Sequence, residues 1–433
     1  MKKHILTCIL ISTLFFFTVN TANELWAENR VDSEENELVA MFISDFHIGE
    51  NYGAVVQEIP AGSDDDYIGH YVEELGTEIY YHTEVANLLE ELEKRATIPY
   101  LIILGDVFDV AVDEVSDAFN LSQIFFNSEI NGSTFMSHFD NVIFVAGNHD
   151  HHVWIMLQER YYIQNQLTEG KEANPFPQQV VGTLELGEEQ PSLWLDENVI
   201  NNDPTDNFMS SILSNNSKPV YVIYPNLYIK YNDGNGICAT HGHFFEKYWN
   251  KDTTLIEHFP KIPEDEDYFK NLQKYNAPFT EFANYAIAQV SDVFAQGLAD
   301  APFEENPPEK FQRIGLYLAE NYSEFFPLAS SSVPLSNIQK LENEADKVAT
   351  YLKQARKQMS EYGLSFDVLV YGHTHKPCYN QSTEIDPDIT IHNTGGWVNI
   401  NVKDTDDFNN STLKKPNPMF LYTDGTIEKI LDR

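Results

Sequence analysis

The sequence predicts an α/β fold, on three observations. Residues 100–104 form an apolar run that ends at Gly105, which is typical of a strand buried on both faces. A helical pattern over 77–96 precedes this run, and a strand-like run over 38–44 precedes the helix, giving the order strand, helix, strand. Four other strand-like runs also end in Asp, Asn or His. Together they predict a sheet with a polar site at its edge.

Residues 1–27 have the pattern of a secretory signal peptide. Two lysines precede an apolar run over 5–19, and Ala22 or Ala27 offers a cleavage site. The run is too short to favour a membrane span. We therefore expect an exported protein, periplasmic or extracellular, with no transmembrane span after removal of the signal. An uncleaved anchor is the alternative.

The chain is strongly acidic. Its formal net charge is −40, from 67 acidic and 27 basic residues, and becomes −41 without residues 1–27. Such a surface repels polyanions, so nonspecific nucleic-acid binding is not expected. Two cysteines remain in the mature chain, Cys238 and Cys378, which are too few for a disulfide framework. They form either one bridge or two buried thiols.

The first two strands each end in a motif that offers metal ligands. Asp45 and His47 follow the strand over 38–44, and residues two apart on an extended segment project to the same side. After the strand over 100–104, Gly105 lets the backbone turn and aims Asp106 out of the sheet.

A third strand, predicted over 141–146, ends in Gly147-Asn148-His149-Asp150. Asn148 offers a neutral oxygen ligand, and His149 a ring that titrates near neutral pH. Asp150 offers a carboxylate able to orient that ring. The next two residues extend the cluster but are expected to begin a helix over 152–167 instead of binding metal: His151 and His152.

Residues 168–219 are polar and predict a loop-rich excursion from the sheet. Strands are predicted next over 220–224, 227–231 and 237–240. The turn residues over 232–236 predict a hairpin between the last two. The last strand ends in His241-Gly242-His243, again with two side chains two residues apart.

Residues 244–363 predict a helical insertion, a possible cap, because strand patterns vanish there and aromatic residues are frequent. Helices are expected over 279–295, 310–322 and 338–359. Strands resume over 366–371, which ends in Gly372-His373-Thr374-His375. The remaining strands are expected over 389–392, 398–402, 418–423 and 426–430, the last two as a hairpin.

Five strand ends thus deliver seven nitrogen and oxygen donors: Asp45, His47, Asp106, Asn148, His241, His373 and His375. Ligands in an open α/β sheet gather outside the carboxyl ends of the strands. Seven such donors without a thiolate suit two divalent ions, and one carboxylate must bridge them. Asp106 is the expected bridge, because it follows the central buried strand.

These motifs, in this order, resemble those of the calcineurin-like metallophosphoesterase family. The motifs are Asp45-x-His47, Gly105-Asp106-x-x-Asp109, Gly147-Asn148-His149-Asp150, His241-Gly242-His243 and Gly372-His373-Thr374-His375. The resemblance spans residues 38–430, apart from the helical insertion. It implies a four-layer αββα sandwich, in which helices flank two mixed sheets, over a domain that we place at 38–431.

The resemblance also implies roles for the donors. Asp45, His47, Asp106 and His375 would bind the first metal, and Asp106, Asn148, His241 and His373 the second. His149 resembles the catalytic histidine of the family, with Asp150 behind it. His243 has no ligand role in the pattern and is a possible substrate contact. Asp109 either orients a ligating histidine or caps its loop.

The implied activity is hydrolysis of a small phosphate mono- or diester by a hydroxide held between two divalent metals, Mn, Fe or Zn. The form of residues 105–109 and 147–150 also resembles the branch that cleaves the pyrophosphate of UDP-diacylglucosamine, although export argues against that role. Two other classes remain open: a metal-stabilised binding module without catalysis, and an acidic metal-buffering protein. The sequence does not indicate an oligomeric state.

Overall fold

The computed structural model describes residues 36–49, 55–57, 67–72, 77–110, 115–130, 132–170, 179–187, 190–195, 204–205, 207–231, 234–246, 249–250, 268–281, 284–285, 337–397 and 416–431. The predicted signal peptide, the helix over 310–322 and the strand over 398–402 lie outside these residues, as does most of the helix over 279–295. Among the described helices, none is both long and apolar enough to cross a membrane.

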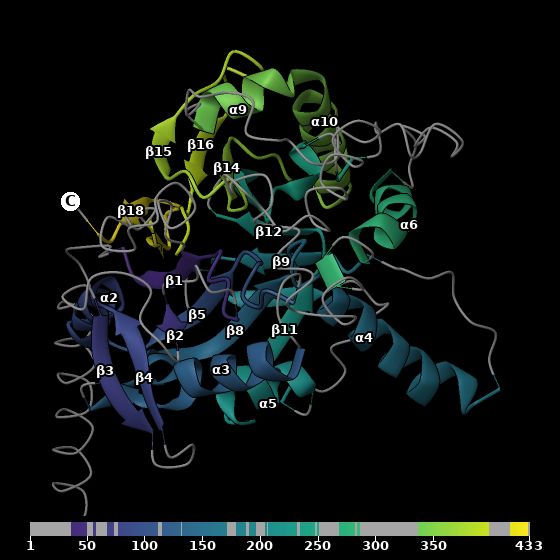
Figure 1. The fold of residues 1–433 in the computed structure, drawn as a ribbon. Helices are drawn as coiled ribbons and strands as arrows, with labels where there is room; N and C mark the ends of the chain where they lie inside the picture. Colours follow the sequence, from purple (N-terminus) through teal and green to yellow (C-terminus); the bar gives the residue numbers. More distant parts are fainter. Residues whose placement is uncertain are drawn as a thin grey trace, which may run out of the picture. The chain divides into compact units, whose positions relative to one another are not determined.

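The first sheet has six strands in the order β11-β8-β5-β1-β17-β18 (Figure 1). Their bounds are β1 Leu38–Ile43, β5 Ile98–Ile103, β8 Phe139–Val145, β11 Val220–Ile223, β17 Met419–Tyr422 and β18 Ile427–Lys429. The first four run parallel, and β17 and β18 form the predicted antiparallel hairpin. β1 and β5 are apolar and buried almost throughout, because neighbouring layers cover both faces.

The second sheet has seven strands in the order β10-β9-β12-β13-β14-β16-β15. Their bounds are β9 Gly182–Glu185, β10 Ser192–Leu195, β12 Asn226–Lys230, β13 Gly236–Thr240, β14 Val368–Tyr371, β15 Cys378–Gln381 and β16 Thr390–Asn393. β12 and β13 are antiparallel, as the predicted hairpin requires, and β13, β14 and β16 are parallel. The sheet is therefore mixed.

The two sheets share one apolar layer. Its buried side chains come from both sheets, including Phe42 and Ile102 from the first and Ile229, Ala239 and Val370 from the second. The opposite faces contribute to a second core that also contains the helices. This arrangement confirms the predicted α/β sandwich with mixed sheets.

The flanking helices are amphipathic and bury their apolar stripes. α2 (Thr83–Glu93), α3 (Val115–Asn127) and α5 (Phe208–Ser214) pack in the core that includes Met41 and Ile43 of the first sheet. α10 (Ala345–Glu361) packs on the second sheet (Figure 1), where the Tyr351 hydroxyl lies 3.1 Å from Thr240 Oγ1. Each helix thus covers an outer face.

The helix predicted over 77–96 begins later than expected. Thr77–His82 is instead a strand, β4, which lies between β2 (Val56–Gln57) and β3 (Tyr67–Val72) in a small sheet. β-branched and aromatic residues over 77–81 favour this pairing. His82 then begins α2, because its Nδ1 accepts a hydrogen bond from the backbone N–H of Glu84 at 3.1 Å.

Residues 168–219 are more regular than the predicted loop-rich excursion. β9 and β10 extend the second sheet, and α5 packs beside α3. The strands have only four residues each, too few to give a clear alternating pattern. The segment therefore contributes to the sandwich.

The remaining short elements are β6 (Glu129–Ile130), β7 (Ser133–Thr134), η2 (Phe135–His138) and η5 (His243–Phe245). α4 (His151–Tyr162) continues into a π-helical turn, η3 (Ile163–Leu167), close to the prediction. The described part of 244–363 is helical beyond η5, with α6 (Tyr268–Glu281), α9 (Asn337–Asn343) and α10. The helix expected over 338–359 is divided between α9 and α10 at Glu344.

Candidate metal centre

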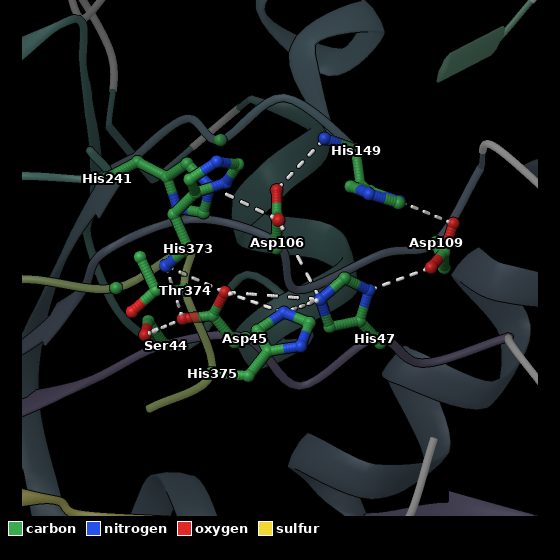
Figure 2. Close-up of polar contacts among 12 residues, drawn as sticks. Ser44, Asp45, His47, Asp106, Asp109, His149, His241, His373, Thr374 and His375 are labelled. Atoms are coloured by element: carbon green, nitrogen blue, oxygen red, sulfur yellow. Dashed lines mark hydrogen bonds and ion pairs between the residues drawn. The ribbon is translucent and has the colours of Figure 1, made fainter. Parts of the chain in front are cut away.

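The candidate site lies at the carboxyl ends of five strands from both sheets. Loops after β1, β5 and β8 bring aspartate, histidine and asparagine side chains from the first sheet, and loops after β13 and β14 bring histidines from the second. Parallel strands end at the same edge of a sheet, which explains why residues far apart in sequence converge here. Figure 2 shows the aspartate and histidine side chains of this site facing one another.

Tight turns of left-handed backbone present the donors. Five of the site residues have positive φ: Asp45 (54°), His47 (48°), Asp106 (53°), His373 (62°) and His375 (51°). Non-glycine residues rarely adopt this conformation, and they are concentrated at functional sites when they do. Backbone bonds between loops hold the turns, including that from Asp45 N–H to the Gly105 carbonyl at 3.0 Å.

The first cluster contains Asp45, His47, Asp106 and His375, and one ligand atom from each lies within 4.8 Å of the others. His47 Nε2 lies 2.9 Å from His375 Nε2 and 3.7 Å from Asp106 Oδ2. His375 Nε2 lies 3.3 Å from Asp45 Oδ1. The structure therefore brings together the four residues that the sequence predicted for the first metal.

The second cluster contains Asp106, His241 and His373. His241 Nε2 lies 3.2 Å from Asp106 Oδ2 and 3.0 Å from Asn148 Oδ1. All four residues predicted for the second metal thus occur here. Asp106 belongs to both clusters, which is the position expected of a bridging carboxylate.

Asp45 and Asp106 are fully buried, and both remain ionised because histidines surround them. Burial raises the pKa of Asp45, but His375 and His241 together outweigh this effect, so the pKa is below its usual value. Burial likewise raises the pKa of Asp106, but His241 and then His149 hold it well below the usual range. Burial lowers the pKa of His241, yet Asp106 raises it to about 9 overall.

This donor set fits divalent cations. Two ring nitrogens face each other at 2.9 Å between His47 and His375, with carboxylates beside them. Buried carboxylates attract positive charge, which is why they favour the protonated form of nearby imidazoles. A divalent cation can bind in place of those protons. Imidazole, carboxylate and amide donors without thiolate suit first-row ions.

His149 is oriented by a different carboxylate from the one predicted. Its Nδ1 lies 2.8 Å from Asp109 Oδ1, and Asp109 Oδ2 lies 2.7 Å from His47 Nδ1. Of the two roles considered for Asp109, the structure therefore shows the orienting one. Burial raises the pKa of Asp109, but His149 and His47 lower it below its usual range. Asp109 is thus a shared anionic support for both rings.

The predicted placement of Asp150 behind His149 was wrong. Its Oδ1 accepts the backbone N–H of Gly147 at 2.5 Å, and its Oδ2 accepts that of Val107 at 2.9 Å. Asp150 begins α4, where its side chain turns towards the loops. Burial and then the charge of Asp106 raise its pKa to about 7. Asp150 therefore holds together the two loops that carry Asp106 and Asn148.

The other histidines considered lie beside the clusters. His243 is buried, with Nε2 3.0 Å from the Tyr224 hydroxyl, and burial followed by His241 keeps its pKa well below the usual value. Because His243 is only 1% exposed, its position does not support the predicted contact with substrate. His151 and His152 begin α4 as expected, and the Nδ1 atom of each lies 2.6 Å from a carboxylate oxygen of Glu281 in α6, which accepts the hydrogen bond.

Two further contacts complete the surroundings. The backbone at Gly396 passes so close to the site that a Cβ there would lie 3.0 Å from the His375 side chain, and Trp397 N–H donates to the Asp45 carbonyl at 3.0 Å.

Sequence reasoning missed Glu246, whose Oε2 lies 3.2 Å from His373 Nε2. Only its position five residues after His241 could have drawn attention to it. Cys238 and Cys378 are both buried thiols, and no disulfide joins them.

Comparison with known proteins agrees with this geometry. Residues 38–280 match the family described as calcineurin-like phosphoesterase. No curated protein matches the chain. The matched region ends before His373 and His375, yet these two residues complete the clusters that the matched residues begin. The match covers more than half of the sequence and includes three strand ends of the first sheet and one of the second, so the chain belongs to the calcineurin-like phosphoesterase family.

Proposed function

We propose that this protein is an exported phosphoesterase that hydrolyses small phosphate mono- or diesters with two divalent cations, Mn, Fe or Zn. The observation that carries the proposal is the membership of Asp106 in both donor clusters. A carboxylate in that position can hold two ions at the short separation that two-metal hydrolysis requires, about 3.5 to 4 Å.

The chain supplies the ligands, and the ions supply the charge. Asp45, His47, Asp106 and His375 would hold one cation. Asp106, Asn148, His241 and His373 would hold the other. When bound, such a pair lowers the pKa of a water towards neutrality and neutralises the oxygens of the phosphoryl group.

His149 is the residue best placed to act on the substrate. Its side chain is 27% exposed, whereas that of His47 is 2% exposed and that of His241 is 1% exposed. Asp109 holds its Nδ1 and stabilises the protonated ring. A protonated imidazole there can stabilise the charge that develops on the phosphoryl oxygens, or give its proton to the leaving oxygen.

The test is hydrolysis of a chromogenic phosphomonoester and the matching diester by the purified mature chain, with and without Mn²⁺, beside Asp106→Asn. We expect metal-dependent turnover that the substitution abolishes, and the preferred ester assigns the substrate class. Two tightly bound ions without turnover of either ester would contradict the proposed activity and favour the binding module. Many loosely bound ions would favour the metal-buffering protein.

Export is part of the proposal and rests on residues 1–27, where two lysines precede an apolar run and small residues follow it. Its test is fractionation of cells that express the full chain. The mature protein, from which the signal peptide has been removed, is expected outside the cytoplasm. A full-length protein that stays in the cytoplasmic fraction would contradict export without affecting the proposed chemistry.

A further inference from the structure

Two histidines of the clusters, His47 and His241, share an arrangement in which the ring nitrogen that faces away from the cluster has its own hydrogen-bond partner. His47 directs Nε2 into the first cluster, and its Nδ1 lies 2.7 Å from Asp109 Oδ2. His241 directs Nε2 towards Asp106 and Asn148, and its Nδ1 lies 2.7 Å from the Leu104 carbonyl. A ligating histidine commonly donates its second N–H to a carboxylate or carbonyl, which fixes the tautomer and raises ligand basicity.

His373 has an equivalent partner in Glu246. The Oε2 atom of Glu246 lies 3.2 Å from His373 Nε2, and the side chains are 27% and 10% exposed respectively. A carboxylate at this distance accepts the proton of Nε2, which leaves Nδ1 as the ring nitrogen available to a cation. Glu246 therefore occupies, for His373, the position that Asp109 occupies for His47.

The backbone around Glu246 is fixed well enough for this task. Its N–H donates to the His243 carbonyl at 3.1 Å, and its carbonyl accepts the N–H of Trp249 at 3.2 Å. The preceding residue, Phe245, is buried between Tyr351 of α10 and Tyr371 of β14, with ring centroids 5.0 and 5.3 Å apart. Tyr371 is two residues before His373, so one aromatic contact positions both members of the pair.

The charge of Glu246 corrects an imbalance between the two clusters. The first contains Asp45 and a share of Asp106, whereas the second has only its share of Asp106 beside neutral Asn148 and two histidines. A carboxylate behind His373 adds negative charge on the poorer side without using a coordination position.

We propose that Glu246 is a positioning residue for the second metal: it fixes the tautomer of His373 through Nε2 and strengthens cation binding at the cluster of Asp106, Asn148 and His241. The proposal rests on the proposed two-metal function. It adds a residue outside the recognised motifs, at the beginning of the segment 244–363, which the sequence predicts to be a helical insertion. Glu246 thus links that segment to the metal centre.

The test compares metal binding by the mature chain with that of Glu246→Gln and Glu246→Ala, by calorimetric titration of the metal-free proteins with Mn²⁺. Glutamine keeps a hydrogen-bond acceptor but loses the charge, and alanine loses both. We expect one of the two sites to weaken about tenfold in Glu246→Gln and towards about a hundredfold in Glu246→Ala, with the other unchanged. Glu185→Gln is the matched control, because the carboxylate of Glu185 also lies beside a nitrogen donor, that of Lys230, and this pair is remote from His241 along the sheet.

A second readout does not depend on bound metal. Long-range ¹H–¹⁵N spectra of the metal-free protein report which ring nitrogen of His373 carries the proton. We expect Nε2–H in the wild type and a mixture of tautomers in Glu246→Ala. Unchanged affinities at both sites, or a wild-type proton on Nδ1 of His373, would overturn the role of Glu246 and leave the proposed function intact. Failure of the wild type to bind two ions would instead refute the two-metal function, and this role with it.

Discussion

Asp109 supports two histidines that have different tasks. One oxygen faces His149, the candidate catalytic residue, and the other faces His47, a candidate ligand of the first metal. A single buried carboxylate therefore couples the orientation of the candidate catalytic ring to that of a candidate metal ligand. Substitutions at these three residues should give distinguishable results.

Replacement of His149 by alanine should lower turnover and leave the metal content unchanged. The ring is partly exposed and belongs to neither of the two clusters that contain Asp106. Loss of a general acid typically costs about a hundred- to ten-thousandfold in rate. Steady-state kinetics combined with metal analysis of the same preparation measures both quantities. If the variant loses metal as well as activity, His149 is a ligand.

Replacement of Asp109 by asparagine should lower turnover and also weaken the binding of one of the two metals. Asparagine removes the negative charge that raises the pKa of His47 against the effect of burial. Loss of the hydrogen-bond partner that orients a metal-binding histidine lowers metal affinity by about ten- to a hundredfold. Calorimetric titration checks this, with His149→Ala as the comparison. Normal affinity at both sites would show that His47 keeps its orientation without the charge.

At this scale the sequence predicted the identity of the donors better than their partners. The seven donors could be predicted because short motifs place them at strand ends. Asp150 was assigned to His149 because the two are adjacent in sequence, but the turn at the start of α4 directs the carboxylate to the amides of Gly147 and Val107. Glu246 could not be predicted, since its contact with His373 joins segments more than a hundred residues apart.

At the scale of the elements, loops at the ends of strands determine the geometry of the site. Gly105 lies in the loop that follows β5 and has a φ of 82°. A Cβ atom at this position would lie 2.6 Å from both Gly147 N and His241 Nδ1. Three loops thus meet at a point that only glycine permits. Close approach of the loops after β5, β8 and β13 depends on that missing side chain.

Substitution of Gly105 by alanine should therefore destabilise the fold and disrupt the second metal cluster. We expect a loss of about 3 kcal/mol or more in the free energy of unfolding, because strain and overlap act together. Gly132→Ala is the control, since Gly132 also has positive φ but a Cβ there meets nothing within 4 Å. It should cost about 1 kcal/mol. Urea denaturation measures both, and equal losses would contradict the close approach.

The helices α4 and α6 are joined by Glu281, whose two oxygens lie 2.6 Å from His151 Nδ1 and His152 Nδ1. The ring of Tyr285 stacks on His152 with centroids 3.4 Å apart. These contacts attach α6 and Tyr285, which lie in the segment predicted to be a helical insertion, to the helix that follows His149. The beginning of α4 therefore has a neighbour from that segment.

Replacement of Glu281 by glutamine should lower the free energy of unfolding by about 2 kcal/mol at pH 7, the cost of losing charge-assisted hydrogen bonds. Burial raises the pKa of Glu281, but His151 and His152 lower it from 4.5 to about 2. The contribution is therefore complete above about pH 4.5 and is lost as the pH falls towards 2.

Thermal unfolding across this pH range checks the prediction, with Glu91→Gln as the control. The carboxylate of Glu91 pairs with the exposed side chain of Lys94, so its loss should have little effect. A difference between wild type and Glu281→Gln that persists undiminished at pH 2 would show that the glutamate does not act through its charge.

At the scale of the whole molecule, the candidate metals would join the two sheets. Asp45, His47 and Asp106 follow strands of the first sheet, whereas His241, His373 and His375 follow strands of the second. Each cluster takes donors from both. A cation bound in either one therefore crosslinks the sandwich at one end of its central apolar layer.

Removal of metal should lower the stability of the whole protein. A ligand present at about a hundred times its dissociation constant stabilises the folded state by about 2.7 kcal/mol. We expect calorimetry to show a lower melting temperature after chelation and recovery on addition of Mn²⁺. Asp106→Asn should show little response to either treatment. An equal melting temperature with and without metal would contradict a crosslink between the sheets.

The sandwich itself was accessible from the sequence, because β1, β5 and β8 are long apolar runs and each ends in a recognisable motif. The short strands β9, β10 and β15 were not, since four residues carry little periodic signal and long-range pairing decides their structure. The division of one predicted helix at Glu344 likewise depends on packing and not on local pattern.

The left-handed backbone at Asp45, His47, Asp106, His373 and His375 has a consequence for engineering. Each such residue costs about 1 kcal/mol relative to glycine, so this chain gives up stability to keep its side chains in place. A library selected for heat resistance alone, without metal present, would enrich glycine at these positions and discard the donors. Improved variants should therefore be sought under a selection that rewards turnover and thermal tolerance together.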